Sequence, residues 1–121
     1  MPRPNKYHAT PTEYGGVRYA SKAEASRAME LDLLLAGGAI RGIVRQPTFR
    51  LGADFRYRAD FLVIDQDGSE HAEDVKGVQT QRFRMCCRLW KKYGIMPLVI
   101  LRSTRSGWER TVIDPIGTRH E

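Results

Sequence analysis

The chain has 121 residues, and its 20 lysines and arginines against 14 aspartates and glutamates give a formal net charge of +6. This length fits one domain with its own core, and the positive charge favours a polyanionic partner, with nucleic acid as the first candidate and an anionic membrane as the second. No segment approaches the roughly 20 apolar residues of a membrane span, and the N-terminus lacks the apolar run of a signal peptide, so we expect a cytoplasmic protein that does not enter a membrane.

The N-terminal segment differs in composition from the rest of the chain. Residues 1–13 hold three prolines and almost no periodic apolar pattern, which predicts a flexible, mildly basic arm. Residues 14–121 contain no internal repeat, low-complexity tract or linker. We therefore expect a single folded domain over residues 14–121.

A first helix is predicted over residues 21–38, which read SKAEASRAMELDLLLAGG. Ser21 as N-cap and Glu24 three residues later form a capping-box pattern, and the two glycines at the end supply a stop. Ala28, Leu31 and Leu35 follow Glu24 at the spacing of one helical face, so they are expected to form the buried stripe. Although the capping box alone explains a glutamate at this position, its place on the apolar stripe favours a functional acid.

Strands are predicted next. Residues 40–51, IRGIVRQPTFRL, read as an irregular strand interrupted at Pro47. Residues 57–65, YRADFLVID, and residues 69–77, SEHAEDVKG, read as two strands joined through Asp67 and Gly68. These two strands should form an antiparallel hairpin.

A second helix is predicted over residues 80–94, TQRFRMCCRLWKKYG, ending at its glycine. Its apolar face carries Phe83, Cys86, Cys87 and Trp90. The two cysteines are adjacent, a poor geometry for a disulfide and no zinc spacing, so we interpret them as reduced core residues.

The basic face of this helix carries Arg84, Arg88 and Lys91. A solvated helix face is the ordinary explanation of such a pattern. The net positive charge favours instead a surface that contacts the phosphates of bound DNA.

Two further strands complete the predicted fold. Residues 96–102, MPLVILR, are short and apolar, as in a strand buried on both faces that returns parallel after a helical crossover. Residues 108–114, WERTVID, would add an edge strand. The order helix, three strands, helix, strand predicts the α/β class, with a mixed β-sheet flanked by helices.

The predicted hairpin carries the candidate chemistry. Asp74 and Lys76 share a strand face because side chains alternate, whereas Val75 points the other way. Whether Asp60 joins them depends on the register. A two-residue loop sends Asp60 to the opposite face, while a three-residue or five-residue loop, or a bulge, brings it to the face of Asp74.

Two carboxylates that meet in a partly buried cleft repel each other unless a cation lies between them. Oxygen ligands of this kind suit Mg²⁺, or Mn²⁺ in its place. Lys76 would then position an attacking water and neutralise charge that develops on a phosphate. The alternative on spacing alone is an exposed edge hairpin that carries charged residues for solubility.

Other polar residues are assigned smaller parts. Gln46 would support a metal-bound water or a phosphate, or would simply satisfy backbone groups. Glu73 is expected to face solvent, since the alternation favours Asp74 as the ligand. His8, His71 and His120 form no ligand or catalytic spacing and are expected at the surface or in the tails.

With Glu24, Asp60, Asp74 and Lys76 identified, the chain resembles the PD-(D/E)XK nuclease superfamily, which includes restriction-type endonucleases and archaeal Holliday-junction resolvases. The superfamily has a restriction-endonuclease-like core in the order αβββαβ. More narrowly, the segments SKAEASRAMELDLLLAGGAI, YRADF and EDVKG, with the later T-x-x-F and its basic residues, are similar to small endonucleases encoded by bacteriophages. This similarity spans roughly residues 14–101.

The resemblance implies a metal site whose ligands are the carboxylates of Glu24, Asp60 and Asp74. It implies the Val75 carbonyl as an additional ligand and Lys76 as the catalytic lysine.

Two further positions bear on the resemblance. Gln46 corresponds to a supporting polar residue that some members carry after the first strand. Ala59 departs from the family pattern, because it stands where members have a proline that shapes the backbone.

These observations lead to one main hypothesis, one rival from another class, and a third possibility, an enzyme with a different target such as a nickase or an RNA nuclease. The main hypothesis is a Mg²⁺-dependent endodeoxyribonuclease, with a preference for Holliday junctions or other branched DNA in phage replication or recombination implied by the resemblance alone. Resolvases act as symmetric dimers, so a homodimer is also implied. The rival is a non-catalytic nucleic-acid-binding module that keeps the basic helix and uses the acidic hairpin only for folding.

Overall fold

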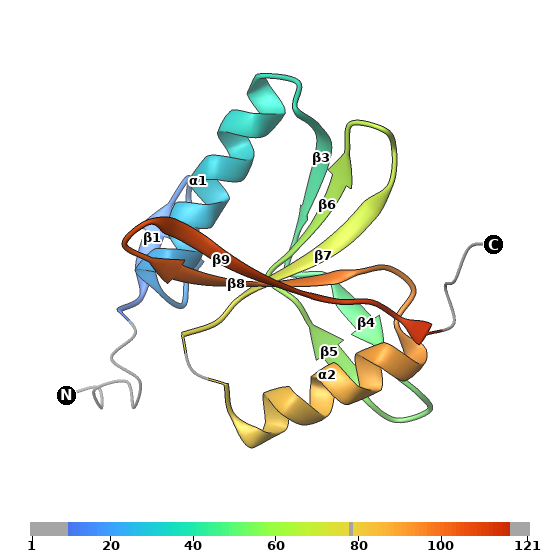
Figure 1. Ribbon diagram of the computed structural model, residues 1–121. Helices are drawn as coiled ribbons and strands as arrows, with labels where there is room; N and C mark the ends of the chain where they lie inside the picture. Colours follow the sequence, from blue (N-terminus) through green and yellow to red (C-terminus); the bar gives the residue numbers. More distant parts are fainter. Residues whose placement is uncertain (1–9, 78, 117–121) are drawn as a thin grey trace.

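The computed structural model describes residues 10–77 and 79–116. Its centre is a mixed five-stranded sheet (Figure 1) with the strand order β3 (Ile40–Arg45), β6 (Phe61–Asp65), β7 (Glu70–Val75), β8 (Leu98–Thr104) and β9 (Gly107–Ile113). Only β7 and β8 pair in parallel, across the helix that connects them. Two helices flank the sheet, so the predicted α/β class and the order αβββαβ are confirmed.

Helix α1 (Lys22–Ala36) covers one face of the sheet, which we call the α1 face. Ser21 caps it as predicted, since its hydroxyl accepts a hydrogen bond from the backbone N–H of Glu24. Ala28 and Leu31 are buried against Phe61 and Val63 of β6, as the stripe required.

The predicted stripe of α1 is wrong at its C-terminal end. Leu35 is 40% exposed, whereas Arg27, which the apolar pattern had left outside, is 5% exposed. The helix can bury Arg27 because the guanidinium pairs with the buried carboxylate of Glu73 on β7.

Helix α2 (Gln81–Tyr93) covers the opposite face, the α2 face; Thr80 caps its start, and it ends at Gly94 as predicted. Phe83, Cys86 and Trp90 are buried there. Trp90 is fully buried, donates its indole N–H to the carbonyl of Met96 at 2.8 Å, and packs edge-on against Phe49. Both cysteines are free.

A small ribbon of β4 (Thr48–Arg50) and β5 (Arg56–Arg58) completes the α2 face. The break at Gln46 and Pro47 separates β3 from β4, as the irregular pattern predicted. The single strand predicted over residues 57–65 is divided in two, because β5 pairs with β4 and only β6 enters the main sheet. Ala59 and Asp60 form the bend between them.

A second ribbon, of β1 (Thr12–Tyr14) and β2 (Val17–Tyr19), packs beside α1. It overlaps the end of the arm predicted over residues 1–13, so Thr12 and Glu13 belong to the fold; the rest of that prediction lies largely outside the described residues, as do His8 and His120. The turn is Gly15 and Gly16, whose φ angles of +59° and +79° are accessible to glycine at little cost.

The last two strands agree with the sequence analysis. Residues Leu98 to Leu101 of β8 are buried on both sides, and β9 pairs with β8 at the edge of the sheet. Neither helix in the described part of the chain is long and apolar enough to cross a membrane.

Candidate active site

The register of the β6–β7 hairpin decides whether the two aspartates meet. Phe61 pairs with Glu73, and the backbone N–H of Asp60 donates to the carbonyl of Glu73. The loop consists of Gln66, Asp67 and Gly68, closed by a bond from the N–H of Asp65 to the carbonyl of Ser69. This three-residue loop puts Asp60 across from Asp74 and on the same face.

Asp74 is the least satisfied group of the site. Its side chain is 1% exposed, and neither of its carboxylate oxygens has a hydrogen-bond partner in the structure. Burial raises its pKa to about 6, with a further contribution from the charge of Glu24 and an opposing one from Lys76. A buried acceptor without a donor costs about 1–3 kcal/mol, and more when it is charged, so such a group needs a reason.

Asp60 and Glu24 lie beside this carboxylate. Asp60 Oδ2 accepts a hydrogen bond from the N–H of Val75 at 2.7 Å, and Glu24 Oε2 accepts one from the N–H of Ala20 at 2.8 Å. Burial, and after it a hydrogen bond with Glu24 and that residue's charge, raises the pKa of Asp60 to about 8. Asp60 thus shares its site with a second acid, which disfavours the ionised form of Asp60.

Lys76 provides the positive charge of the cluster. Its Nζ lies 3.4 Å from Asp74 Oδ2, within ion-pair distance although no aligned hydrogen bond forms. The ammonium also lies 5.0 Å from the ring centre of Phe83 on α2, a cation–π contact. The structure therefore brings Glu24, Asp60, Asp74 and Lys76 into one cluster at the ends of β6 and β7.

Two other predicted residues meet the cluster through their backbone. The N–H of Val75 binds Asp60, while its side chain packs in the core of the α1 face, as the alternation predicted. Gln46 is exposed, and the contact it makes with Asp60 is through its backbone N–H, which donates to the carbonyl of Asp60 at 2.8 Å. Its φ of +55° is unusual for a residue other than glycine and marks the bend that ends β3.

The expectation that Glu73 faces solvent is wrong. Its side chain is fully buried on the α1 face, where Arg27 donates two hydrogen bonds of 2.7 and 2.8 Å to its carboxylate. His71, expected at the surface, is partly buried and lies 2.8 Å from both Glu73 and Asp65. Burial alone would raise the pKa of Glu73, but the bonds from Arg27 and His71 lower it to about 2.

This pair could not be found from local sequence patterns, because Arg27 and Glu73 are 46 positions apart in the chain. A signal was nevertheless present. The strand alternation that places Asp74 on one face requires Glu73 on the other, and that face is the one a helix covers. An acid there needs a basic partner from the helix.

The donor set fits a divalent cation in part. Within residues 10–77 and 79–116, no group of three or more His, Cys, Asp or Glu side chains is already arranged to hold a metal ion. Two of the three carboxylates of the cluster are instead bonded to backbone N–H groups. The orphaned oxygens of Asp74, with two more acids beside them, are nevertheless the oxygen chemistry that Mg²⁺ and Mn²⁺ take.

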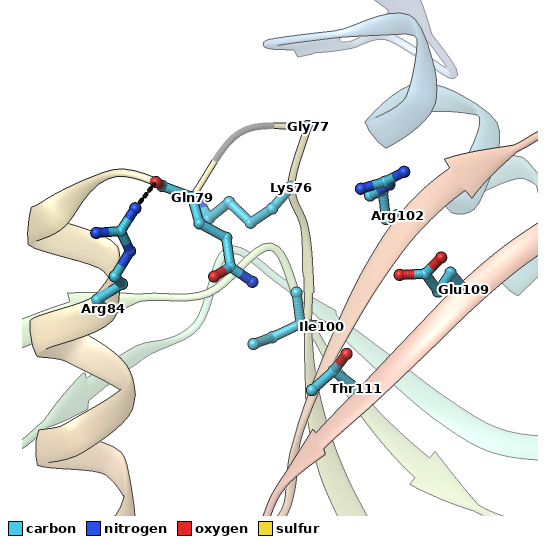
Figure 2. Close-up of a pocket in the computed structure, with 8 residues that line it drawn as sticks. All are labelled: Lys76, Gly77, Gln79, Arg84, Ile100, Arg102, Glu109 and Thr111. Carbon is cyan, nitrogen blue, oxygen red and sulfur yellow. Dashed lines mark hydrogen bonds between the residues drawn. The ribbon is translucent and has the colours of Figure 1, made fainter.

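A cavity of about 320 Å³ adjoins the cluster and shares Lys76 with it. Figure 2 shows it between the start of α2 and the strands β8 and β9; its lining consists of Lys76, Gly77, Gln79, Arg84, Ile100, Arg102, Glu109 and Thr111. Arg84, which the sequence analysis assigned to DNA, reaches this cavity and donates to the carbonyl of Gln79 at 3.3 Å. Arg88 and Lys91 are exposed further along α2 and do not line it.

The comparisons with known proteins give one result. The model of a family described as "Protein of unknown function (DUF1064)" matches residues 4–106, so the chain belongs to this family. No curated protein and no solved structure matches the chain.

Proposed function

We propose that this member of the DUF1064 family is a metal-dependent endodeoxyribonuclease of the PD-(D/E)XK type, which hydrolyses phosphodiester bonds in DNA. The observation that carries the proposal is the carboxylate of Asp74, which is buried with both oxygens unpartnered. Asp60, Glu24 and a lysine stand beside it. A fold keeps such a group when something that is not protein binds there.

The residues that would hold Mg²⁺ are Asp74, Asp60 and Glu24, with the carbonyl of Val75 as an additional ligand. The raised pKa values of Asp74 and Asp60 mean that a nearby positive charge would stabilise their ionised forms. When bound, the ion would supply Lewis-acid stabilisation for charge that develops on the phosphate. Mn²⁺ has the same ligand preference and is the natural substitute.

Lys76 acts from the edge of the cluster. Its side chain is 32% exposed, and its ammonium is held between Asp74 and the ring of Phe83. This placement leaves N–H groups free to orient a water molecule and to neutralise a phosphate oxygen. Lys76 is therefore the residue that faces substrate.

DNA is the proposed substrate because the chain carries a net charge of +6 and because Arg84 extends positive charge from the cluster along α2. Arg88 and Lys91 continue this surface as contacts to phosphate. A preference for Holliday junctions or branched DNA, a role in phage recombination and a homodimer are further parts of the proposal, and they rest on the resemblance of the sequence. A cytoplasmic location is proposed as well.

Cleavage of labelled four-way junction, nicked and linear DNA tests the proposal. With Mg²⁺ or Mn²⁺ the wild type should cut at least one substrate, and EDTA should stop it. Asp74→Ala and Lys76→Ala should each abolish cutting, while the matched control Arg18→Ala, an exposed residue on β2, should cut at the wild-type rate. If Asp74→Ala cut as fast as the wild type, the assigned site would be wrong.

The rival function is a nucleic-acid-binding module without catalysis. The observation that favours it is the pairing of Asp60 and Glu24 with backbone N–H groups, since carboxylates used in this way serve the fold. This module would bind DNA with equal affinity in EDTA and in Mg²⁺, and it would cut none of the three substrates. The same assay, read for binding as well as cleavage, separates the two functions.

A further inference from the structure

The cavity beside Lys76 is lined partly by polar residues that have no role in the proposed catalysis. Lys76 joins it to the carboxylate cluster, but Arg102, Glu109, Thr111 and Gln79 take no part in that cluster. Arg102 and Glu109 are paired across β8 and β9. Both are exposed, so the protein gains little folding stability from placing them there.

The cavity and the cluster lie on the same face of the sheet. Asp74 pairs with Ile100 of β8, and Ile100 pairs with Thr111 of β9. Arg102 and Glu109 follow two residues further along their strands and therefore share this face. A ligand in the cavity would thus be a direct neighbour of a group bound at Asp74, with Lys76 between them.

The charge and shape of the cavity select a ligand. Its lining has three cationic side chains, Lys76, Arg84 and Arg102, against the single carboxylate of Glu109. Its floor is apolar at Ile100, which is 5% exposed, and Figure 2 shows the amide of Gln79 above it. A volume of about 320 Å³ is at the small end of ligand pockets, which span roughly 300–1,000 Å³.

We propose that this cavity takes one nucleotide of the substrate strand, next to the phosphate that is cut, and that it prefers cytosine to thymine. Arg84 and Arg102 hold the phosphate of that nucleotide, and Ile100 supports its base. The preference follows from Glu109, because a carboxylate accepts a hydrogen bond from the amino group of cytosine and repels the carbonyl that thymine has in its place. This inference rests on the proposed function, because only a nuclease would treat the bound strand as its substrate. The binding of the nucleotide itself does not require cleavage.

Equilibrium binding of two labelled single strands in EDTA tests it, with oligo-dC and oligo-dT of equal length as probes. Both are pyrimidine strands, so they differ mainly in the base edge that Glu109 would meet. The wild type should bind oligo-dC at least about fivefold more tightly than oligo-dT. Glu109→Gln should reduce this ratio to about twofold or less, because an amide can donate to thymine as well.

Arg102→Gln should act differently from Glu109→Gln. It should weaken both probes by a similar factor and lower the slope of log affinity against log salt by about 1, as the loss of one phosphate contact does. The matched control is Arg110→Gln, the same change on β9. Arg110 pairs with Leu101, so its side chain lies on the opposite face of the sheet.

Each outcome decides the matter. A cytosine preference that Glu109→Gln removes, together with a salt slope that Arg102→Gln changes and Arg110→Gln does not, supports the nucleotide site. Equal binding of both probes by the wild type, or equal effects of the two arginine variants, overturns it. Because the measurement is made without metal, an absence of DNA cleavage would count against the proposed nuclease and not against this site.

Discussion

Glu73 and Asp74 are consecutive residues of one strand, both acidic and both inaccessible to solvent, yet their surroundings are opposite. Glu73 faces α1, where Arg27 and His71 satisfy its oxygens. Asp74 faces α2, and neither of its oxygens has a hydrogen-bond partner in the part of the chain that the structure describes. The environment lowers the pKa of Glu73 to about 2 and raises that of Asp74 to about 6.

The contrast separates a carboxylate that serves the fold from one that is available for function. The ion pair of Glu73 has its partner within the protein, so its charge is compensated as soon as the chain folds. Among the described residues, the cation within ion-pair distance of Asp74 is Lys76, at 3.4 Å. Burial alone therefore does not identify a functional acid, and the informative property is the absence of a partner among the described residues.

The sharpest way to test the contrast is to neutralise each acid in turn. Asp74→Asn should abolish cleavage, with a loss on the order of a thousandfold, because a metal ligand contributes several kcal/mol to the transition state. In metal-free buffer at neutral pH the same variant should be more stable than the wild type by about 1–3 kcal/mol, since it removes a charge that the fold disfavours. Cleavage rates and urea unfolding in EDTA measure the two effects.

Glu73→Gln is the matched control, and it should lower stability while leaving the cleavage rate nearly unchanged. It leaves Arg27 buried without its counter-charge, so the free energy of unfolding should fall. The protein that remains folded should still cut DNA at a rate close to that of the wild type. If Glu73→Gln instead removed activity without loss of stability, Glu73 would be the ligand and the assignment of Asp74 would be wrong.

Removing the base of the buried pair should have the largest effect on folding. Arg27→Ala leaves the fully buried Glu73 with His71 as its remaining partner, and breaking a buried ion pair costs about 3–5 kcal/mol. The exposed Arg18 of β2 serves as control, since its substitution by alanine should change stability by less than about 0.5 kcal/mol. Equal unfolding midpoints for the two variants in urea would contradict a structural role for the pair.

A smaller effect is expected from pH. Both Asp60 and Asp74 have folded-state pKa values raised above their unfolded ones, to about 8 and about 6. Their protonated forms therefore stabilise the metal-free fold at low pH, and this contribution is lost as the pH rises from about 4 to about 8. Metal binding needs the ionised forms, so the apparent affinity for Mn²⁺ should rise about tenfold or more between about pH 6 and about pH 8.

Thermal unfolding with and without Mn²⁺ measures this dependence. The stabilisation by Mn²⁺ should be larger at about pH 8 than at about pH 6, and Asp74→Asn should remove it at both. Effects of other titrating groups, His71 among them, are present with and without metal and cancel in the difference. A stabilisation by Mn²⁺ of equal size at both values would indicate a site made of groups that do not titrate in this range.

Much of the fold could be predicted from the sequence because its signals are local. Ser21, Thr80 and Gly94 mark helix ends through contacts within one turn. The apolar run of β8 indicates burial on both faces by itself. The β1–β2 ribbon was missed although the signal was there, since Gly15 and Gly16 stand between two short segments with strand propensity.

The site was harder to predict than the fold, because it depends on the register of the β6–β7 hairpin and on contacts between residues far apart in the sequence. Local patterns fixed that Asp74 and Lys76 share a face, but the position of Asp60 depended on a loop length that the sequence left open. Arg27 was assigned outside the apolar stripe, and only the placement of α1 against β7 reveals its partner. The expected burial of Leu35 also failed, because the spacing of the stripe does not reveal how far along the helix the rest of the fold covers it.

The exposed turn of Gln66, Asp67 and Gly68 connects the two strands whose register places Asp60 beside Asp74. Surface turns are ordinarily the segments that tolerate insertions and deletions best. A one-residue deletion that keeps Asp65 opposite Ser69 would leave a two-residue loop, a common hairpin length, whereas a shift of the pairing by one residue would carry Asp60 to the face opposite Asp74. The pairing of Asp65 with Ser69, rather than the side chains of the turn itself, therefore decides whether the two acids meet.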